Sequence, residues 1–480
     1  MAGPGLPRPP AAVPGVRRRG AGAGRVQAGA GAGALNVEGW MKERRVTEVE
    51  CVVADINGIA RGKILPGLKF VRSLADDTLR LPESVFIQTV TGDYPEADVI
   101  DPITRDVRLR PDAGTIHLVP WYDEPTAQVI ADCYHHDGTP VMIQPRHVLK
   151  RVLGLYEARG WKPIVSPELE FFLTKVNTDP DYPLEPPIGR NRRPETARQS
   201  YGIEAANEFD PVFEDVYDWC EVQGIDIDTL THEAGAAQME INFNHGDPLG
   251  LADQVFLFKR TLRQAALKHG IYATFMAKPM HNEPGSSMHI HQSVYDAGTG
   301  ENLFGAANAE GYSPAFLHHI AGLQRYLPAA MPLLAPNVNS YRRLRRYSDA
   351  PINVQWAWEN RTVGLRVPES DRESRRVENR VAGADANPYL AIATTLACGY
   401  LGMVEELQPT DPIKGSAYRM AQTLPQQMPD ALKKLNSSSS LKECLGEDFV
   451  RVLIAVKQTE HEAYQSVISS WEREHLLLNV

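Results

Sequence analysis

The chain has 480 residues, of which 43% are hydrophobic and 23% charged, and its formal net charge is -10. These values are typical of an intracellular globular protein of two or three domains, and the negative balance argues against a nucleic-acid-binding protein. No run of eighteen apolar residues occurs, so we expect no membrane span. The five cysteines are odd in number and lack paired spacing. They favour a reducing compartment, and we expect a cytoplasmic protein.

Residues 1–35 consist almost entirely of Ala, Gly, Pro, Val and Arg, which predicts a disordered tail. The next segment, 36–135, alternates turns with strand-like runs such as 49–56 and 115–121, and this pattern indicates a small N-terminal domain.

Residues 136–480 form a second predicted region, which opens with apolar residues at helical spacing over 141–161. Pro145 fits the first turn of that helix, where its missing N–H costs nothing. Further along, 252–270 also has a helical pattern, and the serine-rich run 436–440 indicates a loop.

Glu168 and Glu170 are the most informative pair in this region. They lie one residue apart in the apolar, strand-like segment 165–173. Side chains on a strand alternate, so both carboxylates share one face, where they repel each other unless a cation lies beside them. The alternative is an exposed strand face with two solvated acids.

Three further clusters carry groups of the same chemistry. Glu233 and Glu240 flank a Gly-Ala-Ala link, His289 and His291 share a strand face, and Glu378 lies within the run 374–381. Each cluster alone has an ordinary structural explanation. Together they supply five carboxylates and a histidine, all predicted on strands, which is the donor set for two magnesium or manganese ions.

Arginines crowd the two segments 339–351 and 359–380. Arginine binds carboxylates and phosphates through two parallel hydrogen bonds, so the combination with cations indicates a site for an anionic transition state such as phosphoryl transfer. A nucleic-acid patch is the alternative, but acids are interleaved with these arginines.

These clusters, in this order, resemble the glutamine synthetase superfamily from about Val37 to the C-terminus. The matching motifs are the EXE strand, the E-x6-E segment, GSSMHIH, NSYRRL, ENRTVGLR, VENR and ADANPYL. Within the superfamily, TEVECVVADINGIARGKILP and GSSMHIH are most similar to the gamma-glutamylpolyamine (gamma-glutamylputrescine) synthetase branch.

The resemblance implies an α+β fold. A small N-terminal β-grasp-like domain (36–135) would precede a large catalytic domain (136–480) with a curved antiparallel sheet. It also implies a homo-oligomer of two stacked hexameric rings, in which a neighbour's N-terminal domain completes each active site. The implied ligands are ATP, glutamate, a small amine and two or more magnesium (or manganese) ions per site.

The resemblance also assigns residues to roles. It implies one metal site at Glu170, Glu233 and Glu240, and a second at Glu168, His289 and Glu378. Nucleotide contacts are implied for His291, Arg366 and Arg376. Glutamate contacts are implied for Gly285, Arg343, Arg361, Arg380 and Glu233. Catalytic roles are implied for Arg343, Arg361 and Asp349.

Departures from the family pattern concern the ammonium half of the site. The segment 79–86 lacks the family's aspartate, and the flap glutamate is replaced by the shorter Asp349. We therefore expect a ligase that joins glutamate to an amine such as putrescine through gamma-glutamyl phosphate. Glu83, Asp349 and Tyr201 are the residues expected near the amine. The alternatives are a glutamine synthetase that uses ammonia and a non-catalytic structural or regulatory relative.

Overall fold

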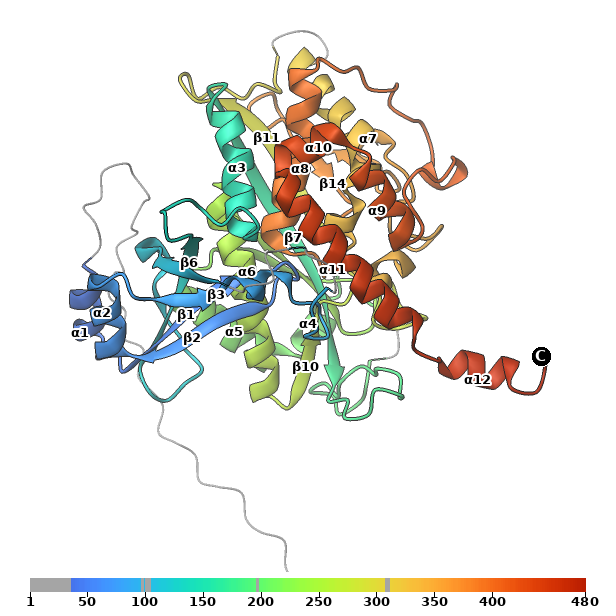
Figure 1. Ribbon diagram of the computed structural model, residues 1–480. Helices are drawn as coiled ribbons and strands as arrows, with labels where there is room; N and C mark the ends of the chain where they lie inside the picture. Colours follow the sequence, from blue (N-terminus) through green and yellow to red (C-terminus); the bar gives the residue numbers. More distant parts are fainter. Residues whose placement is uncertain (1–35, 96–98, 100–104, 196–197, 307–310) are drawn as a thin grey trace, which may run out of the picture.

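The computed structural model describes residues 36–95, 99, 105–195, 198–306 and 311–480, so the predicted tail 1–35 lies outside the described residues. Two sheets organise the chain (Figure 1), a six-stranded one in the N-terminal part and an eight-stranded one in the remainder. The predicted fold class is confirmed. The protein is α+β, with a small β-grasp-like part preceding a larger part with a curved, mainly antiparallel sheet.

The strands of the smaller sheet are β1 (Glu48–Ala54), β2 (Ala60–Pro66), β3 (Arg80–Pro82), β4 (Asp106–Pro111), β5 (His117–Leu118) and β6 (Thr126–Tyr134). Their order is β2-β1-β6-β4-β3, and β5 pairs with β6. β1 runs antiparallel to β2 but parallel to β6.

The strand predicted at 115–121 is shorter in the structure, where only β5 is extended and paired. A 3-10 turn, η2 (Ala113–Thr115), precedes it and is capped by the Asp112 side chain. Pro120 follows shortly after, and because proline has no N–H it cannot extend the ladder.

The strands of the larger sheet are β7 (Trp161–Lys175), β8 (Ile227–His232), β9 (Gln238–Phe243), β10 (Ile271–Thr274), β11 (Met288–Asp296), β12 (Trp356–Trp358), β13 (Leu365–Val367) and β14 (Val377–Asn379). Their order is β12-β13-β14-β11-β7-β9-β8, and β10 pairs with β7. Only β12 and β13 pair in parallel among these described strands.

The helices before the sheet's last three strands are α1 (Val37–Glu43), α2 (Gly67–Ala75), η1 (Glu83–Ile87), α3 (Pro145–Glu157), α4 (Ile203–Asn207), α5 (Asp210–Gln223), α6 (Pro248–Lys268), α7 (Pro314–Leu334) and η3 (Val338–Arg342). Those after them are α8 (Pro388–Val404), η4 (Ala417–Arg419), α9 (Met428–Asn436), α10 (Ser439–Leu445), α11 (Glu447–Gln465) and α12 (Ser470–Leu476). No helix within the described ranges is both long and apolar enough to cross a membrane.

Two helix predictions differ from the structure at their ends. α6 begins at Pro248, ahead of the predicted 252, because the Asp247 side chain caps its first turn at Gly250. The loop predicted at 436–440 is shorter in the structure, where only residues 437–438 lie outside a helix. α9 continues through Asn436 and α10 begins at Ser439, since both helices bury apolar side chains around the short link.

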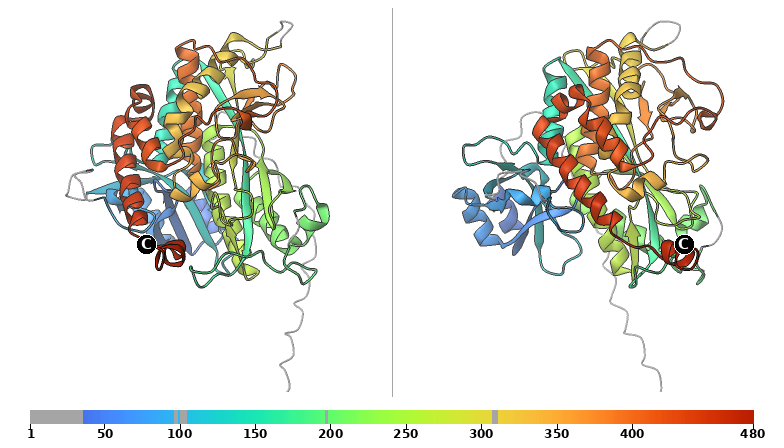
Figure 2. Two further views of the ribbon diagram at one scale, coloured as in Figure 1. Left: turned by 90° about the vertical axis from the view of Figure 1, so that its right-hand side faces the viewer. Right: turned by 45° about the vertical axis from the view of Figure 1, so that its right-hand side comes forward.

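The two faces of β7 have different surroundings. Leu169, Phe171 and Leu173 are fully buried, and the Phe171 ring contacts Phe258 of α6. α3 also packs on β7, while α8 packs on β11, and the helices α8 and α10 lie beside α3 (Figures 1 and 2). The helices therefore cover one face of the sheet, and the even-numbered residues of β7 project from the other.

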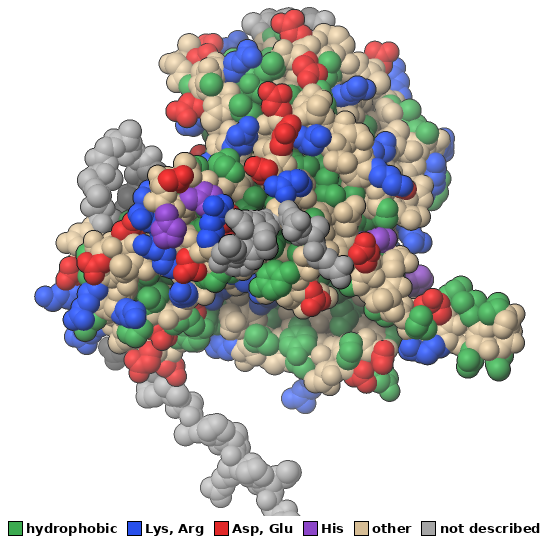
Figure 3. Space-filling model, in the orientation of Figure 1, with side chains coloured by type: hydrophobic (Ala, Val, Ile, Leu, Met, Phe, Trp, Pro, Cys, Tyr) green, Lys and Arg blue, Asp and Glu red, His purple; other side chains and the backbone are tan. Residues whose placement is uncertain are grey.

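A buried arginine joins the two parts of the molecule. Arg146 of α3 donates to Asp132 of β6 at 2.8 Å and to Asp253 of α6 at 2.9 Å. On the face shown in Figure 3, acidic and basic side chains are interspersed, and α12 projects from the body with exposed apolar side chains such as Trp471.

Candidate active site

One face of the larger sheet gathers the acidic and histidine side chains. β7 lies between β11 and β9, so Glu168 is paired with His289 on one side and Asn242 on the other. Two residues along β7, Glu170 is paired with Glu240. β14 pairs with β11 on the side away from β7 and places Glu378 opposite His291. The register thus places residues that are distant in sequence on neighbouring strands of one surface.

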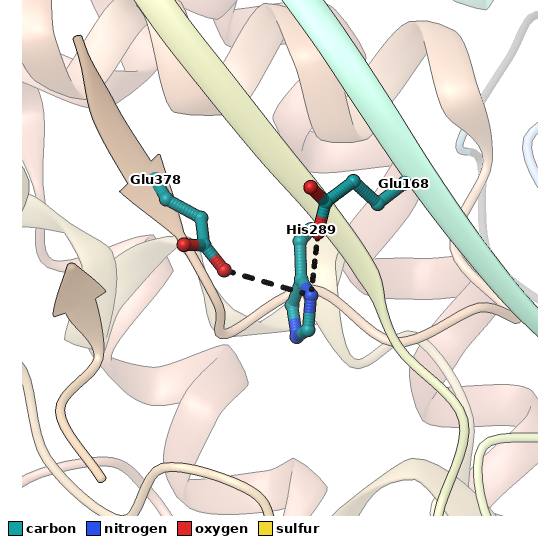
Figure 4. A group of neighbouring side chains, drawn as sticks. All are labelled: Glu168, His289 and Glu378. Carbon is teal, nitrogen blue, oxygen red and sulfur yellow. Dashed lines mark hydrogen bonds and ion pairs between the residues drawn. The ribbon is translucent and has the colours of Figure 1, made fainter. Parts of the chain in front are cut away.

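Glu168, His289 and Glu378 form the first close group (Figure 4), with one donor atom from each lying within 4.8 Å of the others. His289 Nδ1 lies 3.3 Å from Glu168 Oε2 and 3.6 Å from Glu378 Oε1. His291 Nε2 lies 2.8 Å from Glu168 Oε1. Glu378 is completely buried, and Arg366 and Arg380 both donate to it.

Glu170, Glu240 and His289 form a second close group that shares the histidine. Ser287 donates its backbone N–H to Glu170 at 2.8 Å and its hydroxyl at 2.6 Å. The same hydroxyl oxygen lies 2.9 Å from His289 Nε2. Ser287 therefore links the carboxylate of Glu170 to the imidazole of His289.

The acids of the two groups and the neighbouring Glu233 ionise very differently. Glu233 belongs to neither close group, and burial and then the charge of Glu170 raise its pKa to about 7. Burial and the neighbouring carboxylates raise the pKa of Glu240 well above its usual value. Although burial disfavours its charge, Arg380 lowers the pKa of Glu378 to about 2. Burial also lowers the pKa of His289, which keeps this imidazole neutral.

This donor set fits divalent cations. His289 Nδ1 faces two carboxylates across 3.3 and 3.6 Å, which brings one nitrogen and two carboxylate ligands close enough to share one cation. Burial raises the pKa of Glu170 and of Glu240. A bound cation would stabilise the charged form of both carboxylates. Oxygen-rich ligation with one imidazole suits magnesium or manganese.

A cavity of about 430 Å³ opens beside the first group. The three residues expected to contact nucleotide, His291, Arg366 and Arg376, all line this cavity together with Glu168. Buried polar atoms without a hydrogen-bond partner lie on residues at its wall, among them Nδ1 of His291, Oδ1 of Asn242 and Nε of Arg366. These atoms are themselves buried, so the groups that the cavity offers to a polar, anionic ligand are the side chains of its lining residues, including Arg366 and Arg376.

The residues expected to bind glutamate gather beyond the second group. Arg343 is buried next to Gly285, where an added Cβ would meet Arg343 Cγ at 2.3 Å and the Ala277 carbonyl oxygen at 2.6 Å. Burial lowers the pKa of Arg343 to about 10, while the charge of Glu170 opposes this shift. Only glycine allows the backbone to approach the aliphatic part of the Arg343 side chain this closely.

Arg361 and Asp349 differ from the buried Arg343, because both lie exposed on loops. The charge of Arg361 lowers the pKa of Glu233, although burial raises that pKa overall. The charge of Asp349 raises the pKa of Lys278, although burial lowers that pKa overall. These loops form the outer edge of the glutamate end.

One expectation about placement needs correction. Glu233 is not on a strand but on the turn after β8, because the Gly-Ala-Ala link turns the chain there. Arg380 follows β14, and its backbone N–H donates to the Gly364 carbonyl. Glu83 is buried on η1, where its carboxylate pairs with Arg105 of the same chain.

Sequence reasoning did not assign roles to Ser287, Gln238 and Glu359. Gln238 donates to Glu170 at 3.3 Å and to the Gly285 carbonyl at 3.0 Å. Glu359 accepts from Arg366 at 3.1 Å. Gln238 was detectable, because it precedes Glu240 by one strand period. Ser287 was detectable in the same way, because it precedes His289 by one strand period. Glu359 acts through a tertiary contact that leaves no pattern in the sequence.

A buried carboxylate cluster beside an arginine-lined cavity is typical of enzymes that bind divalent cations and transfer phosphoryl groups. Residues 142–476 match the family described as glutamine synthetase, catalytic domain. The chain belongs to the glutamine synthetase family and is a ligase of that class.

Curated relatives from several organisms cover nearly the whole chain. Gamma-glutamylputrescine synthetase PuuA of Escherichia coli (strain K12) is 35% identical, over 90% of this chain and 92% of the relative. Glutamate–isopropylamine ligase of Pseudomonas sp. is 32% identical, over 91% of this chain and 96% of the relative. Glutamine synthetase of Thermus thermophilus is also 32% identical, over 88% and 99%.

Solved structures agree with this fold. Apo GmaS without ligand has a TM-score of 0.78 at 26% identity, covering 92% of this chain and 99% of GmaS. A GmaS/ADP complex has a TM-score of 0.79 at 26% identity, with the same coverage of both chains.

Proposed function

We propose that this ligase joins the gamma-carboxylate of glutamate to an amine, with a polyamine such as putrescine as the nucleophile and ATP as the energy source. The observation that carries the proposal is the order of sites on the sheet. The cavity with His291, Arg366 and Arg376 lies on one side of the carboxylate cluster, and Arg343 with Gly285 lies on the other. Two anionic substrates bound there would meet at the cluster. The relatives named for putrescine and isopropylamine support the amine as nucleophile.

The residues that would hold two or more magnesium (or manganese) ions are the five acids and the histidine of the cluster: Glu170, Glu233, Glu240, Glu168, Glu378 and His289. When bound, such ions neutralise charge on phosphoryl oxygens. Without such ions, ionised acids in this cluster would be costly, because several of them are buried close together.

The chain's own residues bind and orient the substrates. Arg366 and Arg376 would hold nucleotide phosphates, and Arg343, Arg361 and Arg380 would hold glutamate and the transferring phosphoryl group. In the first step the gamma-carboxylate oxygen bonds to the terminal phosphorus of ATP, and ADP leaves.

In the second step the amine nitrogen attacks the acyl carbon of gamma-glutamyl phosphate. The bond from that carbon to the phosphate oxygen breaks, phosphate leaves, and the nitrogen loses a proton as the amide forms. Asp349 lies at the glutamate end and is the acid we place beside the amine, where its loop would also limit the access of water to the acyl phosphate.

Glutamine synthesis from ammonia is the second candidate, since glutamine synthetases are among the relatives. The segment 79–86 without an aspartate and the shorter flap acid favour an alkylamine instead. A non-catalytic role is disfavoured, because all six ligand positions carry residues that can bind a metal ion, and five of them lie in the two close groups. We further propose a domain boundary near residue 135, a cytoplasmic location and a homo-oligomer of two hexameric rings.

Phosphate release from ATP, measured with glutamate and magnesium across a panel of amines, tests the function. The proposal requires release that depends on both glutamate and an alkylamine, with the matching gamma-glutamyl amide as product. Release with ammonium alone would establish a glutamine synthetase, and no release with any nucleophile would favour the non-catalytic alternative.

A further inference from the structure

The loop after Arg343 has an unusual backbone conformation. Tyr347 has φ 58° and Asp349 has φ 57°, both in the left-handed region that residues with a Cβ rarely adopt. The Ser348 hydroxyl between them donates to the Arg343 carbonyl at 2.7 Å. Such strain persists only where surrounding contacts impose it, and it concentrates at ligand-binding positions.

The contacts that impose this conformation centre on Tyr418. Its ring lies against that of Tyr347, with the centroids 5.3 Å apart and the planes 53° from parallel. Arg346 donates to the Tyr418 carbonyl and, at 3.0 Å, to the Met420 carbonyl. The loop with Tyr347 and Asp349 is thereby fastened to η4.

A second loop is fastened to the same element. The Ala417 N–H donates to the Thr362 hydroxyl at 2.9 Å, and buried Asn353 donates to the Ala417 carbonyl at 3.0 Å. Thr362 follows Arg361 directly. Tyr418 therefore lies where the loops that carry Arg343, Arg361 and Asp349 converge.

The charges around Tyr418 locate it at the glutamate end. Burial raises the pKa of the Tyr418 phenol, Asp349 raises it further, and Arg380 and Arg343 oppose the shift. Tyr418 is buried, but Tyr347 is 76% exposed, so one ring of the pair is open to a ligand. Among the described residues, no cation lies within ion-pairing distance of the Asp349 carboxylate.

We propose that the Tyr347–Tyr418 ring pair and the Asp349 carboxylate form the subsite for the carbon chain and distal ammonium of a diamine substrate. Ring faces attract both methylene groups and ammonium ions, and an unpaired carboxylate completes the cation site. Ammonia has neither chain nor distal charge, so it gains nothing from this arrangement. This inference rests on the proposed function and replaces Glu83 and Tyr201 with Tyr347 and Tyr418 beside Asp349.

The test compares kcat/KM for putrescine, for butylamine of equal chain length and for ammonium. Tyr347→Ala should lower the butylamine-to-ammonium ratio of kcat/KM by about tenfold, whereas Tyr347→Phe, which keeps the ring, should preserve it. Asp349→Asn should lower the putrescine-to-butylamine ratio by about tenfold, because only the distal charge is affected. Using ratios separates the subsite from any general role of Asp349 in catalysis.

Tyr182→Ala is the matched control, since Tyr182 is 71% exposed on a separate loop, and it should preserve both ratios. Melting temperatures of all variants confirm that the comparison is between folded proteins. Alkylamine turnover in the wild type with unchanged ratios in Tyr347→Ala and Asp349→Asn would overturn the subsite alone. A wild-type enzyme that forms no amide with any alkylamine would overturn the proposed function as well.

Discussion

Ser287 donates both its backbone N–H and its hydroxyl to the carboxylate of Glu170, at 2.8 and 2.6 Å. The same hydroxyl oxygen lies 2.9 Å from Nε2 of His289. One serine thus contacts a member of each close group.

Replacing this serine should weaken metal binding without removing a metal ligand. We expect Ser287→Ala to raise the Kd for manganese by about 10- to 100-fold, the usual effect of losing a group that orients metal ligands. Titration followed by electron paramagnetic resonance measures the Kd. Ser73→Ala, at a buried serine of α2, is the control and should stay within about twofold. An unchanged Kd in Ser287→Ala would show that the serine is not needed for orientation.

The acids themselves should be needed for turnover but not for folding. We expect Glu170→Ala to lose most turnover in magnesium while remaining folded, because burial already raises the pKa of Glu170 and disfavours its charge. Glu378→Ala should lose most turnover as well. Steady-state rates and circular dichroism check both variants, and a wild-type rate in either would remove that residue from the proposed metal site.

The metal-free protein should become less stable as pH rises. The folded-state pKa of Glu233 is raised from 4.5 to about 7, so its contribution to stability is complete below pH 4.5 and is lost as pH rises through 7. That loss is on the order of 3 kcal/mol for this one group.

Thermal melts from pH 4.5 to 8 with a chelator measure the effect, and saturating magnesium should reduce it because cations stabilise the ionised acids. Glu233→Gln should flatten the metal-free profile. A profile that is equally steep in this variant would contradict the assignment of the slope to Glu233.

Gly285 should tolerate no side chain. A Cβ there would lie 2.3 Å from Arg343 Cγ and 2.6 Å from a backbone oxygen, so Arg343 must move. We expect Gly285→Ala to lower kcat/KM for glutamate by at least about tenfold, more than 1.4 kcal/mol of transition-state stabilisation, with a smaller effect on the KM for ATP. Gly154→Ala, in α3 with open space around the glycine, is the matched control. Equal losses for both substrates would indicate general disruption instead.

How much the sequence could predict depends on the range of the interaction. Strand periodicity correctly placed Glu168 and Glu170 on one face, because that relationship is local. The pairing of Glu168 with His289 depends on the order of strands in the sheet, which only the resemblance supplied. Glu233 was placed on a strand although the link after it turns the chain.

Contacts between loops could not be predicted at all. Tyr347 and Tyr418 are distant in sequence, and neither stands in a periodic pattern. Their contact follows from hydrogen bonds of Arg346 and from a left-handed backbone conformation that the residue type does not favour. The departures at 79–86 and Asp349 indicated a changed amine end, but only the structure identifies the aromatic pair beside Asp349.

The most direct test of the central claim is the ratio of kcat/KM for putrescine to that for ammonium in the wild-type enzyme, with glutamate, ATP and magnesium saturating. The proposed function predicts a ratio of at least about 100, roughly 2.7 kcal/mol of transition-state discrimination. A ratio of one or less, with no other alkylamine used better than ammonium, would contradict it and identify the enzyme as a glutamine synthetase.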